Sequence, residues 1–137
     1  MIEPKRFPYV AKQSDIGEAG FFPLLPIQLI HNNQTIDVHG LLDSGSTVNV
    51  LPFEMGISLG LDWNSQNIPI TLTGNLAKVE SRAVLINAKA DSFPQCHLAF
   101  AWTKSNDVPL LLGQTNFFME FNVFFYRSQL AFEVVPK

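Results

Sequence analysis

An aspartate stands at the end of an apolar run in the segment GLLDSGSTVNVLP, residues 40–52. Asp43 follows two leucines and precedes the small residues Ser44, Gly45 and Ser46, after which an apolar alternation resumes. An ionised carboxylate at the end of a buried strand needs hydrogen bonds or a partner charge, because otherwise its pKa rises until it is neutral. Gly45 permits a sharp turn, and the amides and hydroxyls of the loop can then hold the carboxylate in place.

A carboxylate held in this way can do acid–base chemistry if it meets a second one. Two carboxylates about 3 Å apart cannot both ionise, so they share a proton, and one pKa rises while the other falls. One group can then act as a base on a water molecule while the other acts as an acid. The simpler alternative is an Asx-type turn, in which Asp43 only ends a strand.

A second motif follows about 70 residues downstream of Asp43, where Leu111, Leu112 and Gly113 precede the segment QTNFF. The two motifs together resemble the retropepsin-like aspartic proteases, in particular the bacterial and retrotransposon-like branch of that family. In that family an apolar pair leads into Asp-Ser/Thr-Gly-Ser/Ala, and an apolar-apolar-Gly turn comes before a short C-terminal helix. The resemblance covers residues 21–135, and both motifs in this order and spacing are more specific than Asp-Ser-Gly alone.

The resemblance implies a role for each matching position. Asp43 matches the catalytic aspartate, and Ser44 matches the residue whose hydroxyl links two active-site loops at a dimer axis. Gly45 and Ser46 match the loop that positions the carboxylate. The turn that packs beneath this loop corresponds to Leu111, Leu112 and Gly113. A flap that closes over substrate is expected at residues 70–83 with its tip at Gly74 and Asn75, although the glycine-rich tip of the viral enzymes is missing.

The sequence holds a single Asp-Ser-Gly, so one chain supplies only half of a dyad. Asp91 and Asp107 lack the small neighbouring residues, and Asp62 is followed by Trp63. A working pair therefore requires Asp43 of a second copy across a two-fold axis. Six of the twelve phenylalanines fall within residues 117–132, and such a density either fills one core or extends into an interface.

The rest of the sequence is typical of short strands separated by turns, which indicates an all-β domain with one or two short helices. We expect hairpins around residues 31–34 and around Gly74-Asn75, and a short helix that begins after Pro52 and ends at Gly60. A strand over residues 95–103 places Cys96, Leu98, Phe100 and Trp102 on one face. We expect a strand, a glycine turn and a short helix in residues 110–121, then two strands joined around residues 126–129. Residues 1–20 are interpreted as an irregular N-terminal arm and residues 21–137 as the protease domain, a small closed barrel.

Other reactive residue types carry weaker signals. Ser44 and Ser46 lack the Gly-x-Ser-x-Gly context of a nucleophile. The three histidines (His31, His39 and His97) have no ligand-like spacing, and Cys96 fits a packed thiol. Alternating charges at Lys78, Glu80 and Arg82 are interpreted as a solvated strand face with no function.

Length and composition limit the function classes. A chain of 137 residues with 47% hydrophobic residues fits one folded domain. A net charge of −3 argues against a broad surface for nucleic acid or anionic membrane. No apolar run reaches the length of a membrane span, and the N-terminus lacks the apolar region of a signal peptide. With Cys96 as the single cysteine, we expect a reducing compartment, namely the cytoplasm.

The sequence thus predicts a homodimeric, retropepsin-like aspartic endopeptidase that needs no metal or organic cofactor and acts on a peptide or protein substrate. Two alternatives stay open. One is a catalytically weak or inactive module of the same fold that binds peptides or acts as a scaffold. The other is an unrelated β-barrel that carries a small apolar ligand.

Overall fold

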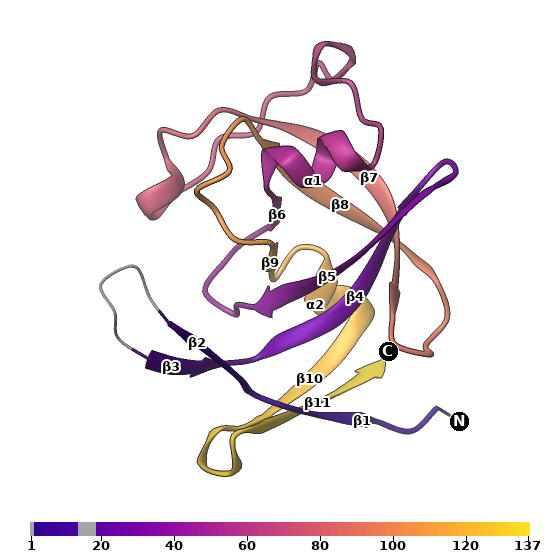
Figure 1. Ribbon diagram of the computed structural model, residues 1–137, viewed down its shortest axis with the longest axis vertical. Helices are drawn as coiled ribbons and strands as arrows, with labels where there is room; N and C mark the ends of the chain where they lie inside the picture. Colours follow the sequence, from indigo (N-terminus) through magenta and orange to yellow (C-terminus); the bar gives the residue numbers. More distant parts are fainter. Residues whose placement is uncertain (1, 14–18) are drawn as a thin grey trace.

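The computed structural model describes residues 2–13 and 19–137, and its centre is a closed six-stranded barrel (Figure 1). Hydrogen bonds connect the strands in the order β4-β5-β9-β6-β8-β7, and β4 also pairs with β7, which closes the barrel. The barrel strands are β4 (Leu24–His31), β5 (Gln34–Leu42), β6 (Asn49–Leu51), β7 (Ser81–Ala90), β8 (Cys96–Thr103) and β9 (Leu111–Leu112). The predicted all-β barrel with short helices is confirmed.

The hairpin of β4 and β5 delivers the chain to Asp43. Leu25, Ile27 and Leu29 alternate toward the core and are almost completely buried. The turn lies at Asn32, whose φ of 52° is in the left-handed region that asparagine tolerates better than most residues. The antiparallel register runs from Leu24 opposite Leu41 to His31 opposite Gln34, so the hairpin predicted around residues 31–34 is confirmed.

Strand β8 supplies the centre of the core. Its alternating residues Leu98, Phe100 and Trp102 are buried, as the pattern predicts, while Cys96 at the strand end is half-buried. Helix α1 (Phe53–Ser58) packs on Trp102 so closely that a Cβ on Gly56 would lie 2.2 Å from the indole ring. The helix is followed by Gly60 at a φ of +79°, which confirms the predicted helix and its glycine stop.

The C-terminal segment forms a second sheet below the barrel. Helix α2 (Phe117–Glu120) leads into β10 (Phe121–Tyr126), the 3-10 turn η3 (Arg127–Gln129) and β11 (Ala131–Pro136). The phenylalanine-rich tail divides between the core and the exposed surface. Phe117, Phe121 and Phe132 are buried in the core, whereas Phe124 and Phe125 on β10 are 45% and 42% exposed.

The N-terminal segment has more regular structure than the sequence predicts. Strand β1 (Lys5–Pro8) pairs with β11 in the order β1-β11-β10, and β2 (Val10–Gln13) pairs with β3 (Ala19–Phe22). Lys5 Nζ lies 2.7 Å from Asp91 Oδ2, and this contact lowers the pKa of the Asp91 carboxyl. Residues 1 and 14–18 of the predicted arm lie outside the described residues, and the boundary at residue 20 stays a prediction. No helix in the described part of the chain is long and apolar enough to cross a membrane.

Candidate active site at the end of strand β5

Asp43 is the first residue after β5, and β9 fixes its backbone. The pairs Leu41–Leu111 and Leu42–Leu112 run parallel, and the Asp43 amide donates a hydrogen bond of 3.0 Å to the carbonyl of Leu112. The two sequence motifs therefore lie next to each other in space, at the paired strands β5 and β9. The Asp43 side chain is half-buried, at the edge between the core and solvent.

A tight turn holds the Asp43 carboxylate. The Gly45 amide donates to Asp43 Oδ1 at 2.9 Å, and the Ser46 amide donates to the Asp43 carbonyl at 3.1 Å. Ser46 Oγ donates to the carbonyl of Val48 at 2.7 Å, which ties the end of the turn to the next segment. The Asx geometry of the simpler alternative is therefore present, and it fixes one carboxylate oxygen beside a backbone amide.

Gly113 packs directly beneath this turn. The amides of Gln114 and Thr115 donate to the carbonyls of Ser46 and Thr47 at 2.9 and 2.8 Å. A Cβ on Gly113 would lie 2.5 Å from the carbonyl oxygen of Val48 and 2.7 Å from that of Ser46. Since these neighbours are backbone atoms and cannot rotate away, only glycine fits here. On the outer side Gln114 Nε2 donates to the carbonyl of the exposed Ser44 at 2.8 Å.

Two asparagines that the sequence analysis did not single out connect this turn to β8. Asn49 is fully buried, and its Oδ1 accepts the Gly113 amide at 2.8 Å. Its Nδ2 donates to the carbonyl of Ala99 at 3.0 Å and to Asn116 Oδ1 at 3.2 Å. Asn116 Oδ1 also accepts the Ala99 amide at 3.1 Å. The available signal was Asn49 itself, an amide inside the apolar strand VNVL, since a buried amide must find partners.

A cleft of about 320 Å³ opens beside Asp43. One side is the Asp43 turn with Val48, Val50 and Leu111, and the other is a loop over residues 71–80 that contributes Leu72 through Leu76. The predicted flap-tip residues Gly74 and Asn75 line the same cleft as Asp43. Leu72 is buried in an apolar cluster with Val50 and Leu111. The structure thus brings both motifs and the candidate flap tip together.

The hairpin predicted around Gly74-Asn75 is wrong in form. Residues 74–76 make the 3-10 turn η2 (Gly74–Leu76), and Gly74 has a φ of +63°. The two sides of the segment pair only near its base, where Pro69 bridges Arg82. The reason is that Leu72 turns into the apolar cluster instead of continuing the alternation of a strand. Of the solvated strand face predicted at Lys78, Glu80 and Arg82, the first two residues are exposed, but they lie before β7. The prediction is wrong for Arg82, because its guanidinium binds backbone carbonyls.

Other polar groups do not form a comparable centre. A hollow of about 380 Å³ on the outer face of β4, β5 and β7 is lined by exposed residues such as Asp37, His39 and Lys89, and it shares no residue with the Asp43 cleft. Among residues 2–13 and 19–137, no three His, Cys, Asp or Glu side chains are grouped so as to hold a metal ion. Burial, with a smaller effect of the Glu120 charge, raises the pKa of the Cys96 thiol to about 11, so this thiol is a poor nucleophile at neutral pH.

Comparison with known proteins identifies the architecture. No protein-family model matches the chain, and no curated protein matches it in sequence. Among solved structures, the chain is similar to a retropepsin-like aspartic protease from Rickettsia conorii, with a TM-score of 0.63 over 97% of this chain and 96% of that chain. The chain has a retropepsin-like fold. Because the two sequences are only 14% identical, this likeness describes the fold, and the chemistry has to be argued from the residues of the site.

Within the retropepsin-like fold, the residues of the two motifs occupy one structural unit. The turn after β5 carries Asp43, β9 supports that turn from below, and the loop over residues 71–80 borders the cleft on the other side. The similarity extends over nearly the whole chain, so it also includes the N-terminal strand and the C-terminal sheet that flank the barrel.

Proposed function

We propose that this chain is an aspartic endopeptidase in which Asp43 of two copies forms the catalytic pair at a homodimer axis. The observation that carries the proposal is the Asp43 carboxylate, fixed by the Gly45 amide at the edge of a cleft in a retropepsin-like fold. One chain has one such carboxylate, so the partner must supply the other. Peptide or protein substrates fit a cleft that is lined by both apolar and polar residues.

In the proposed mechanism the two Asp43 carboxyl groups share one proton. The ionised group takes a proton from a water molecule while the oxygen of that water bonds to the peptide carbonyl carbon. The protonated group gives its proton to the carbonyl oxygen. When the tetrahedral intermediate breaks its C–N bond, the protonated carboxyl group gives its proton to the leaving nitrogen, and the ionised carboxylate takes a proton from a hydroxyl of the intermediate. The products are a carboxylic acid and an amine, and the pair again holds one proton. No metal or organic cofactor takes part in these steps.

Self-association has support in the C-terminal sheet. Strand β10 lies at the edge of the β1-β11-β10 sheet, so one row of its backbone groups is open to pairing. Phe124 and Phe125 on this strand are large apolar side chains exposed to solvent. An unpaired edge next to exposed aromatic residues is the kind of surface that a second copy can cover.

The substitution Asp43→Asn tests the proposal because it keeps the side-chain shape and an acceptor for the Gly45 amide. We expect hydrolysis of a diverse peptide library to fall by at least about 1,000-fold, since a dyad without its base cannot activate water. Sedimentation and thermal unfolding should show the dimer and the fold retained. Cleavage by the Asp43→Asn variant at a rate near that of the wild-type protein would refute the assignment.

A second candidate function rests on the loop over residues 71–80, which lies against the barrel with Leu72 buried. This second candidate is a peptide-binding module of the same fold, which would hold extended peptides in the cleft without cutting them. The same library separates the two functions. Peptide binding by the wild-type dimer without any product favours the binding module, whereas Asp43-dependent product favours the protease.

A further inference from the structure

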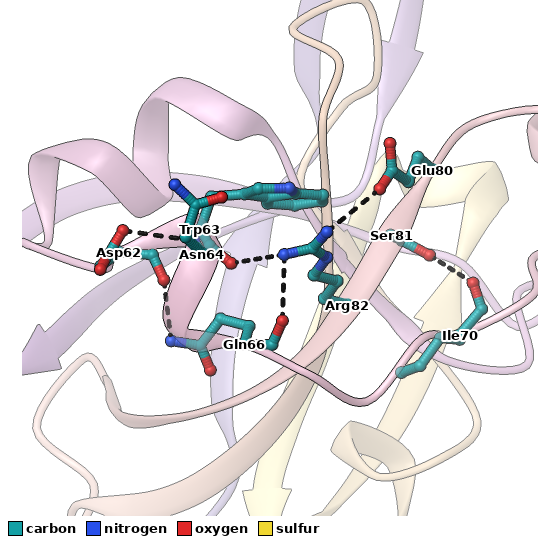
Figure 2. Close-up of polar contacts among 8 residues, drawn as sticks. All are labelled: Asp62, Trp63, Asn64, Gln66, Ile70, Glu80, Ser81 and Arg82. Atoms are coloured by element: carbon teal, nitrogen blue, oxygen red, sulfur yellow. Dashed lines mark hydrogen bonds and ion pairs between the residues drawn. The ribbon is translucent and has the colours of Figure 1, made fainter.

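The guanidinium of Arg82 joins two segments at the root of the loop over residues 71–80 (Figure 2). Its Nη1 donates to the carbonyl of Trp63 at 2.8 Å and to that of Gln66 at 3.1 Å. These carbonyls belong to the 3-10 turn η1 (Trp63–Ser65) and to Gln66, the residue that ends it. The Cζ atom lies 4.5 Å from the centroid of the Trp63 ring, so the cation also stacks on the indole.

The Trp63 ring on which Arg82 stacks is held rigidly because it belongs to the core. The Trp63 ring packs edge-on against Trp102 at 5.1 Å and against Phe53 at 6.0 Å, measured between ring centroids. Trp63 itself is buried. Because Arg82 binds both the carbonyl and the ring of Trp63, its guanidinium is attached through Trp63 to the barrel and to α1.

Both ends of the loop are fastened at this point. The Ile70 amide donates to the Ser81 carbonyl at 3.0 Å, and Ser81 Oγ donates back to the Ile70 carbonyl at 2.7 Å. Figure 2 shows this contact beside the Arg82 contacts. From the other side, the Lys104 amide donates to the Glu80 carbonyl at 2.9 Å. The two ends of this ten-residue loop, at Ile70 and Ser81, are therefore held side by side.

Arginine suits this position better than lysine would. One guanidinium nitrogen reaches two carbonyls while the plane of the group stacks on indole, which a single ammonium cannot reproduce. The ion pair of Arg82 Nη2 with Glu80 is long, at 3.5 Å, and Glu80 is 62% exposed, so it contributes little. The contacts that matter are the carbonyl bonds and the stacking.

We infer that Arg82 is a positioning residue that sets the place of the loop over residues 71–80 relative to Asp43. The inference rests on the proposed function, since the loop matters for catalysis only if the Asp43 cleft binds the substrate. The loop supplies Leu72 to Leu76 as one wall of that cleft, and its path is determined where its two ends are clamped. If the contacts of Arg82 with Trp63 and Gln66 are removed, a substrate has to order the loop as it binds, and the cost of this ordering weakens binding.

The test compares Arg82→Met and Arg82→Lys with two controls. Methionine keeps part of the apolar stem on Trp63 but removes the donors, and lysine keeps the charge and can reach one carbonyl. Glu80→Gln removes only the exposed ion pair, and Lys89→Met removes an exposed cation from the same strand, β7. We expect KM for a cleaved peptide to rise about tenfold in Arg82→Met with kcat changed less than about threefold, and by a smaller factor in Arg82→Lys. Both controls should stay within about twofold of the wild-type protein.

Hydrogen exchange supplies a readout that does not depend on activity. In the wild-type protein the amides of Leu76, Ala77 and Val79 donate to carbonyls within the loop. We expect Arg82→Met to increase exchange in peptides covering residues 71–80, with peptides from β4 and β8 unchanged. A wild-type protein that cuts no peptide contradicts the proposed function, while the exchange result still tests the clamp. An Arg82→Met variant with wild-type KM and wild-type loop exchange overturns the inference. If Arg82→Met does not fold, Arg82→Lys decides by the same two measurements.

Discussion

Replacing Asn49 by leucine tests whether a buried amide supports the active-site turn. Asn49 accepts the Gly113 amide and donates to the Ala99 carbonyl and to Asn116 Oδ1, and it is fully buried. Leucine has the same branched shape and a larger volume, so the change removes three hydrogen bonds and leaves no cavity. The Gly113 amide is then buried without a partner, which costs about 1–3 kcal/mol. Ala99 is exposed and Asn116 is half-buried, so water can replace the lost donor, and each of these lost bonds costs only about 0.5–1.5 kcal/mol.

These contributions predict that Asn49→Leu lowers the free energy of unfolding by about 3 kcal/mol. For a chain of this size we expect a decrease in Tm of roughly 10–15 °C. Urea unfolding followed by tryptophan fluorescence measures the loss, at a fixed protein concentration because self-association would add stability. The matched control is Asn87→Leu on the outer side of β7, with an expected change within about 0.5 kcal/mol. A loss below about 1 kcal/mol for Asn49→Leu would contradict the reasoning, because the Gly113 amide alone should cost that much.

The remaining predictions concern Gly113, beneath the Asp43 turn, and the Cys96 thiol at the start of β8. Gly113→Ala pushes a methyl group to within 2.5 Å of the Val48 carbonyl oxygen, so we expect a loss of about 1–3 kcal/mol in urea unfolding and displacement of the Asp43 turn, seen as lower peptide turnover. The Cys96 thiol, with its pKa raised to about 11, should react with iodoacetamide at pH 8 about 100-fold more slowly in the folded protein than in urea. Since the folded pKa lies above the ordinary value of 9.0, the stability from this neutral thiol should be lost as the pH rises from about 9 toward 11. Equal reaction rates in the two states would contradict the burial of the thiol.

Much of the barrel could be predicted from the sequence because its strands alternate locally. The hairpin of β4 and β5 has an apolar period of two and an asparagine at the one position with positive φ, so its turn and register follow from the residues themselves. The pairing of Asp43 with the Leu111-Leu112-Gly113 segment is a long-range contact. It could be anticipated because the two motifs resemble a known pair, and no local pattern encodes it.

The segment over residues 66–83 shows where local patterns fail. Alternation across IPITLT predicts a strand, but Leu72 gains more by entering the apolar cluster with Val50 and Leu111 than by continuing a two-stranded ribbon. Arg82 fits a solvated strand face by its spacing. Its actual partners are the backbone carbonyls of Trp63 and Gln66. Every residue has a backbone carbonyl, so residue types alone do not show which of them Arg82 binds.

The candidate site therefore depends on two kinds of residue: those that are visible in the sequence as part of a motif, and those whose role appears only in the structure. Asp43 and Gly45 are visible because they form the Asp-Ser-Gly motif. Gly113 is visible because a side chain at its position would meet backbone carbonyls. Asn49 and Arg82 are common residue types whose importance arises from backbone groups brought to them by other segments. A chain could keep both visible motifs and still lose the geometry of the cleft if either of these two residues changed. For a retropepsin-like fold at low sequence identity, the presence of Asp43 alone is thus a weaker indicator of activity than Asp43 together with its buried amide support and a clamped loop.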